Sequence, residues 1–211
     1  MPRKSSEQQF DTLQAINEQA FVLFGRFGYE GVSVGDIAKA AKLSKGALYW
    51  HYHGKEALYL ACLKRLHAIF NEYIFDPMRA SDDPVARISA VFAGLHQLVQ
   101  DPRVTQGVAG YWLVPSRPEM ATLESAQREF EEQSIAAIEE TLQRGTEQQR
   151  FDFGRDLQDM ARAIMAIIEA IVLPLRHQSP EEVHLNLGVL ARTLFRAYAK
   201  PEDLDALMQL I

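Results

Sequence analysis

A lysine, a glycine, two phenols and an imidazole lie close together in one short segment of the chain. Residues 44–52 read SKGALYWHY. Such charged and hydrogen-bonding side chains suit a groove lined with phosphates and base edges, and glycine permits close approach of a backbone. On residue types alone, two interpretations are open: a DNA-binding surface, and an aromatic-rich helical hairpin inside an all-helical core.

Two short helices are expected to position these residues. Ser33 precedes the helical pattern of residues 34–41, and Ser44 precedes that of residues 45–52. A serine oxygen in front of a helix accepts a hydrogen bond from one of its free N–H groups. The pattern therefore predicts a helix-turn-helix over about residues 33–52.

Helical periodicity continues along the rest of the chain, and strand signals are nearly absent. Apolar residues recur at spacings of three or four. We expect helices over residues 10–27, 55–73, 85–100, 103–113, 118–144, 156–177 and 180–200, with a short tail helix over 202–210. The sequence therefore predicts an all-α fold.

Four stretches near the N-terminus carry a more specific pattern. They read GYEGVSV at 28–34, DIAKAA at 36–41, SKGALYWHY at 44–52 and KEAL at 55–58. Together they resemble the DNA-binding domain of the tetracycline-repressor (TetR) family of bacterial transcriptional regulators. The resemblance implies an N-terminal three-helix DNA-binding domain, residues 1–55, and a larger helical domain for effector binding and dimerisation, residues 56–211. It also favours a repressor over an activator.

The resemblance implies a set of DNA-contacting residues. Ser33 and Lys55 match positions that hold phosphates, and Lys45 matches one that reaches base edges. The full set is Ser33, Lys45, Gly46, Tyr49, His51, Tyr52 and Lys55. Val34 stands where the family often has a hydroxyl, and Gly35 lacks a side chain. We therefore expect the first helix of the motif to contribute little to base reading.

The two late helices are apolar over more than one face, so each needs a second packing partner. The resemblance implies that two helices from each chain form a four-helix dimer interface, while burial within one chain remains open. The predicted interface residues are Ile164, Ile167, Ile171, Leu175, Leu187, Leu190, Leu194 and Tyr198. A homodimer would read a palindromic double-stranded operator with half-sites about one helical turn apart.

The resemblance also implies a ligand cavity between the middle helices, whose occupation changes the spacing of the DNA-binding heads. The candidate lining residues are Phe70, Tyr73, Phe92, His96, Tyr111, Trp112, Phe130, Met165, Ile168 and Glu169. Aromatic and methionine side chains around few polar groups suit a small hydrophobic effector, aromatic or cationic. An ordinary core would show the same residue types, so that alternative stays open.

Charge is divided unevenly along the chain. There are 22 Lys and Arg against 28 Asp and Glu, a formal net charge of −6. Residues 1–55 contain seven basic and five acidic residues and so carry +2, which leaves −8 for residues 56–211. Such asymmetry indicates nucleic-acid contact at one end.

Other functional classes find little support in the sequence. The single cysteine, Cys62, is expected to be a buried structural thiol. The longest apolar stretch is too short to cross a bilayer, and we expect a cytoplasmic protein without membrane contact. The histidines lack the spacing of a metal site, so we expect no metal and no cofactor. Because no nucleophile or acid–base pair can be assembled, we expect no enzyme. An all-α enzyme and a protein–protein adaptor remain the alternatives.

Overall fold

The computed structural model describes residues 6–114, 116–152, 156–173, 179–200 and 204. Helices dominate these residues, and no strand occurs among them beyond an isolated antiparallel bridge between Phe151 and Ala199. The predicted all-α fold is confirmed. No helix in the described part of the chain is long and apolar enough to cross a membrane.

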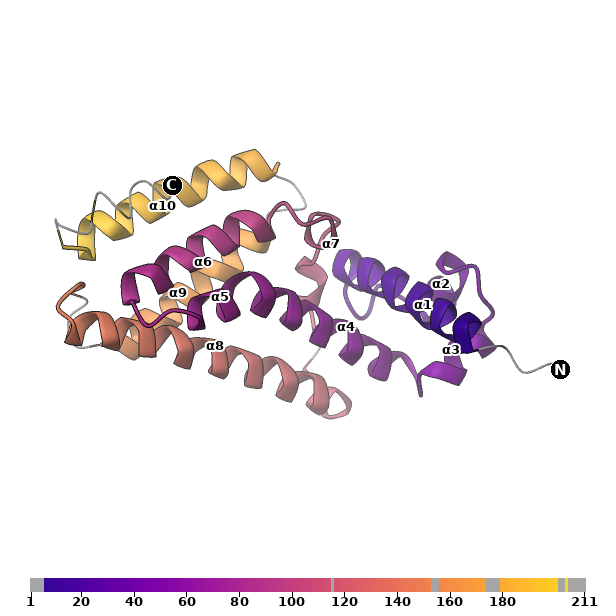
Figure 1. Cartoon of the computed structure of the whole chain (residues 1–211). Coiled ribbons are helices and arrows are strands. Elements are labelled where there is room, and N and C mark those ends of the chain that lie inside the picture. Colours follow the sequence, from indigo (N-terminus) through magenta and orange to yellow (C-terminus); the bar gives the residue numbers. More distant parts are fainter. Residues whose placement is uncertain (1–5, 115, 153–155, 174–178, 201–203, 205–211) are drawn as a thin grey trace. The chain divides into compact units, whose positions relative to one another are not determined.

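The chain divides into two compact units, unit 1 with residues 1–66 and 106–127, and unit 2 with residues 67–105 and 128–211. Unit 1 holds the N-terminal helices, coloured indigo to violet in Figure 1, and a later segment of the chain. Its elements are α1 (Ser6–Phe27), α2 (Val34–Ala40), α3 (Lys45–His51), most of α4 (Lys55–Phe70), η2 (Ala109–Trp112), η3 (Pro118–Met120) and the start of α8 (Ala121–Glu147).

An aromatic core explains why the later segment belongs to unit 1. The ring of Tyr59 on α4 is fully buried, with centroids 4.8 Å from Phe24 and 5.4 Å from Tyr111. The Tyr111 hydroxyl donates a 2.9 Å hydrogen bond to the carbonyl oxygen of Phe21 on α1. Packing thus extends this unit beyond residues 1–55, whereas the functional division at residue 55 stays a prediction.

Unit 2 contains the remaining helices. They are the end of α4, the π-helical turn η1 (Asn71–Phe75), α5 (Asp76–Arg79), α6 (Pro84–Leu98), α7 (Pro102–Thr105), most of α8, α9 (Leu157–Val172) and α10 (Pro180–Tyr198). The helix predicted over residues 103–113 is wrong, because the chain breaks at Gly107 with φ 106° and forms α7 and η2 instead. The predicted tail helix lies outside the described residues, apart from Leu204.

The π-helical turn marks the place where α6 packs against the run from α4 to α5. Pro77 has no N–H, so the carbonyl of Tyr73 lacks its α-helical donor and the helix widens locally. A Cβ on Gly94 of α6 would overlap the Tyr73 carbonyl oxygen. Only glycine permits this close approach of the two backbones.

Candidate nucleic-acid interface and ligand cavity

Two serine caps begin the helices of the helix-turn-helix. The Ser33 hydroxyl accepts from the Asp36 N–H at 3.1 Å, and the Asp36 carboxylate accepts from the Ser33 N–H at 2.9 Å. This reciprocal pair is a capping box. Hydrogen bonds from Ser33 hold the pKa of the Asp36 carboxyl below its ordinary value. The Ser44 hydroxyl accepts from the Ala47 N–H at 3.2 Å, so both helices begin at the predicted caps.

The turn between α2 and α3 depends on a left-handed residue. Lys42 adopts φ 57°, and the Leu43 N–H returns to the Ala38 carbonyl at 2.8 Å. This arrangement satisfies carbonyls at the end of α2. Ile37 and Leu48 are fully buried and anchor α2 and α3 in unit 1.

Most of the α3 surface is left open. Leu48 is fully buried, whereas the side chain of Trp50 is 66% exposed. Its ring stands edge-on to His51, with centroids 4.7 Å apart. Tyr49 is also exposed. In a seven-residue helix one buried leucine is a sufficient anchor, which leaves the two aromatic residues after it facing outward.

Lys45 lies across the start of α2. A Cβ placed on Gly35 would lie 2.8 Å from Lys45 Cε, 3.1 Å from its Nζ and 3.4 Å from Ser33 Oγ. The missing side chain of Gly35 therefore makes room for the lysine, and the structure brings the Lys45 ammonium close to the Ser33 hydroxyl. The Lys45 ammonium can hold a phosphate here, whereas the Ser33 hydroxyl already donates its proton to the Asp36 carboxylate.

The other predicted DNA-contacting residues differ in their environment. The Lys55 ammonium lies 4.1 Å from the centroid of the Tyr29 ring, a cation–π contact. A Cβ on Gly46 would meet Ser44 Oγ at 3.8 Å, an ordinary contact. Tyr52 is turned inward, because its hydroxyl donates a 2.6 Å hydrogen bond to Asn17 Oδ1 on α1. Burial raises the pKa of that phenol.

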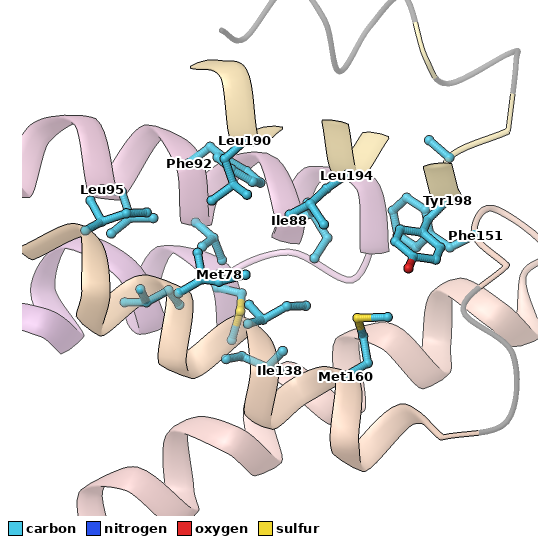
Figure 2. A pocket seen from close by; sticks show the side chains of 16 residues that line it. Met78, Ile88, Phe92, Leu95, Ile138, Phe151, Met160, Leu190, Leu194 and Tyr198 are labelled. Atoms are coloured by element: carbon cyan, nitrogen blue, oxygen red, sulfur yellow. The ribbon is translucent and has the colours of Figure 1, made fainter. Parts of the chain in front are cut away.

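A small apolar cavity of about 50 Å³ lies within unit 2. Figure 2 labels Leu190 and Leu194 of α10 and Ile88 and Phe92 of α6 among the residues that line it. Its lining contains no charged residue and consists of Met78, Ile88, Val91, Phe92, Leu95, Ile138, Phe151, Met160, Ile164, Ile167, Ile168, Ile171, Leu190, Leu194, Tyr198 and Ala199. An apolar ligand is the chemistry that this lining fits.

Two of the ten predicted pocket residues, Phe92 and Ile168, line this cavity. Met165 is buried on the same helix as Ile168, and Glu169 next to it is half-buried. Tyr111 and Trp112 belong to unit 1.

The four remaining predicted pocket residues make other contacts in unit 2. Phe70 and Phe130 pack edge to face with centroids 6.1 Å apart, and His67 stacks on Phe130 at 4.1 Å. The Tyr73 hydroxyl donates to Asp101 Oδ2 at 2.8 Å. The ring of His96 lies 4.4 Å from that of His184. Aromatic residue type did not separate the lining of a cavity from ordinary core.

The predicted interface residues lie mostly around the same cavity. Six of the eight line it, namely Ile164, Ile167, Ile171, Leu190, Leu194 and Tyr198. Of the other two, Leu187 is buried and Leu175 lies outside the described residues. Other apolar residues are exposed instead, among them Ala163, Ala166 and Ala170 on α9, Leu173 directly after it, and Leu185 and Val189 on α10. We refer to these six as the exposed stripe. Alanine carries little hydropathy signal, so only its spacing of three and four could have indicated the α9 part.

Comparison with known proteins gives a family for the N-terminal region. Residues 16–62 match the family model described as bacterial regulatory proteins, tetR family. The HTH-type transcriptional regulator AcrR of Shigella flexneri is 41% identical over 59 residues, which are 28% of this chain and 27% of that protein. The match thus spans about a quarter of the length of this curated relative.

Solved structures extend the likeness of fold over nearly the whole chain. A gamma-butyrolactone receptor (ArpA-like protein) has 18% identity and a TM-score of 0.73, covering 97% of this chain and 96% of that one. AibR, in complex with isovaleryl coenzyme A and operator DNA, has 22% identity and a TM-score of 0.66, covering 84% and 97%. In residues 16–62, which hold its helix-turn-helix, the chain is similar to the tetR family of bacterial regulatory proteins.

Proposed function

We propose that the chain is a transcriptional repressor that binds a palindromic operator as a homodimer and is released by a small hydrophobic effector. The exposed surface of the helix-turn-helix carries this proposal: Tyr49 and Trp50 are open on α3, and the Lys45 ammonium lies at the start of α2. These groups combine phosphate donors with side chains that fit a groove. The operator-bound structure of AibR gives the fold a precedent for this use.

Lys45 and Lys55 have different roles in this proposal. Lys55, held over the Tyr29 ring, binds a phosphate and contributes affinity for any sequence. Lys45 begins α3, at the end that reaches base edges in helix-turn-helix proteins, and contributes sequence preference.

Dimerisation is assigned to the exposed stripe on α9 and α10. Alanines on α9 allow a partner helix to approach closely, and Leu185 and Val189 on α10 are 68% and 58% exposed. Burying these exposed apolar side chains against a second copy stabilises the pair. Two-fold symmetry then presents two α3 helices to a palindrome.

The effector is assigned to the apolar cavity of unit 2. A volume of about 50 Å³ is below the ~300–1,000 Å³ of small-molecule pockets, so the effector must displace side chains to enter. It is uncharged, because no charged residue lines the cavity. Release follows if it binds a DNA-incompetent conformation more tightly than the competent one.

Selection from random double-stranded DNA by the full chain tests the proposal. We expect a palindromic site to be enriched, and gel shifts with that site then compare Lys45→Ala, Lys55→Ala and, as a control, exposed Lys64→Ala on α4. Lys55→Ala should weaken binding to all sequences and flatten its salt dependence, whereas Lys45→Ala should also relax sequence preference. Failure to bind any duplex would support an adaptor or enzyme instead. If both variants lost the same DNA affinity and Lys45→Ala kept the sequence preference of the wild type, Lys45 would be a phosphate contact instead.

A further inference from the structure

A groove of about 360 Å³ lies between α1 and α4, within unit 1. Its volume falls in the range of about 300–1,000 Å³ that small-molecule pockets occupy. The cavity of unit 2, about 50 Å³, does not reach that range as it stands. The groove is therefore the site that could admit a ligand without first being opened.

The lining of the groove is apolar at one end and carries one cation, Arg65, and one anion, Glu18, toward the other. Phe10 and Leu13 come from the first turns of α1, and Phe10 is 66% exposed. Arg65 on α4 lies over the ring of Phe21, 4.8 Å from its centroid. At 1.5 Å per residue, Phe21 lies about 16 Å along α1 from Phe10.

Arg65 is free to receive an anion. Its guanidinium forms no ion pair with a carboxylate in the part of the chain that the structure describes, and a cation–π contact leaves its N–H donors available. The other charged group of the lining, the Glu18 carboxylate, accepts a 2.9 Å hydrogen bond from Gln14. An apolar chain with one carboxylate matches this arrangement.

We propose that the groove binds an amphipathic monocarboxylate, with its chain along Phe10 and Leu13 and its carboxylate on Arg65. This site is separate from the effector cavity proposed above, and it differs in chemistry because the lining of that cavity carries no charge.

Occupation of the groove acts on α3 through one hydrogen bond. Asn17 lines the groove, and its Oδ1 accepts the Tyr52 hydroxyl at 2.6 Å, which ties the end of α3 to α1. A carboxylate is an acceptor only, so in the groove it competes with Asn17 Oδ1 for the Tyr52 hydroxyl and loosens the position of α3. A monocarboxylate therefore lowers operator affinity from within unit 1.

Titration calorimetry of the full chain with sodium decanoate, below its micelle concentration, tests the site. We expect saturable binding at one site per chain. Arg65→Ala should weaken it at least about tenfold, because a charge-assisted contact is lost, and Arg65→Lys should retain most of it. Glu18→Gln should strengthen it by removing a like charge. Lys64→Ala, the neighbouring exposed lysine, serves as the control and should leave it unchanged.

Three results would overturn the site: no saturable binding, equal affinity of wild type and Arg65→Ala, or equally tight binding of decyltrimethylammonium, which has the same chain and the opposite charge. Thermal melts show whether each variant is folded. If Arg65→Ala does not fold, the affinity of Glu18→Gln for decanoate and the affinity of the wild type for decyltrimethylammonium decide whether the groove binds a carboxylate.

The coupling has its own test with the selected operator. Decanoate should lower the operator affinity of the wild type, and Tyr52→Phe should bind decanoate equally well but lose that effect. An undiminished effect in Tyr52→Phe contradicts the route through Asn17. Operator binding without decanoate is measured in parallel, so normal operator binding with no decanoate binding overturns only the groove proposal.

Discussion

The contact between Gly35 and Lys45 couples a residue of α2 to the first residue of α3. A glycine in a helix usually costs stability, about 0.5–1 kcal/mol relative to alanine. Here the open position gives the lysine chain a surface on which to lie. Gly35 thus determines where the Lys45 side chain can lie.

Gly35→Ala is expected to displace Lys45 while retaining the fold. The new methyl group would lie 2.8 Å from Lys45 Cε, the far end of a flexible side chain that can move. We expect thermal stability to be equal or raised by up to about 1 kcal/mol, and operator affinity to fall in the same direction as in Lys45→Ala. Melting curves and gel shifts measure the two effects. The double variant with Lys45→Ala and Gly35→Ala should bind the operator as well as Lys45→Ala alone. If the two losses of affinity added up, the contact between these residues would be contradicted.

The capping box gives α2 a defined response to acid. Because Ser33 donates to the Asp36 carboxylate, the folded pKa of Asp36 is below its ordinary value. Because this pKa is depressed, the ionised Asp36 carboxylate stabilises the fold fully above the unfolded pKa. That stabilisation is lost as the pH falls through the folded pKa. We expect the Ser33 amide signal in NMR spectra to titrate with a midpoint below about 3.9, the ordinary Asp value. In Asp36→Asn this titration should be absent, and a midpoint at or above the ordinary value would contradict the capping box.

Among the elements, the crossing of α6 and η1 depends most on a single residue. Gly94→Ala should destabilise unit 2 by roughly 3 kcal/mol, because its Cβ would overlap the backbone oxygen of Tyr73, which cannot rotate away. Chemical denaturation measures the loss. Gly46→Ala is the matched control: the nearest atom to its Cβ is Ser44 Oγ at 3.8 Å, so stability should be unchanged or slightly raised. Equal stability of the two variants would contradict the close crossing.

Local signals predicted the start of the helices better than the partners of their faces. Ser33 and Ser44 stand next to the N–H groups that they cap, so sequence spacing alone places α2 and α3. Ile164 and Ile167 have the right periodicity for any buried face, but whether the partner is α6, α10 or a second chain depends on distant packing. The break at Gly107 and the π-helical turn before Pro77 likewise depend on backbones that meet only in the folded chain.

At the scale of the whole molecule, charge follows the two compact units. Unit 1 contains 10 basic and 8 acidic residues and so carries +2, while unit 2 carries −8, the same division as that made at residue 55. An acidic unit 2 disfavours contact with phosphates. A charge of +2 also gives one unit 1 only modest electrostatic attraction to DNA. The operator affinity that we propose therefore requires two heads acting together.

Disrupting the exposed stripe should separate dimerisation from DNA contact. Ala166→Arg places a charge in the middle of the α9 part of that stripe, and we expect a monomer in sedimentation velocity experiments. Its affinity for the full palindrome should fall by about a hundredfold or more, because the second contact is no longer intramolecular. Affinity for a half-site duplex should stay within about twofold of the wild type, because the helix-turn-helix is unaltered.

The control adds the same charge on another helix. Gln143→Arg, on an exposed position of α8, should leave both the oligomeric state and operator affinity unchanged. If Ala166→Arg remained dimeric, the two chains would have to meet elsewhere, and the isoleucines around the cavity would again be candidates. If it became monomeric but still bound the palindrome as tightly as the wild type, a single head would suffice. The modest charge of unit 1 would then no longer limit its affinity.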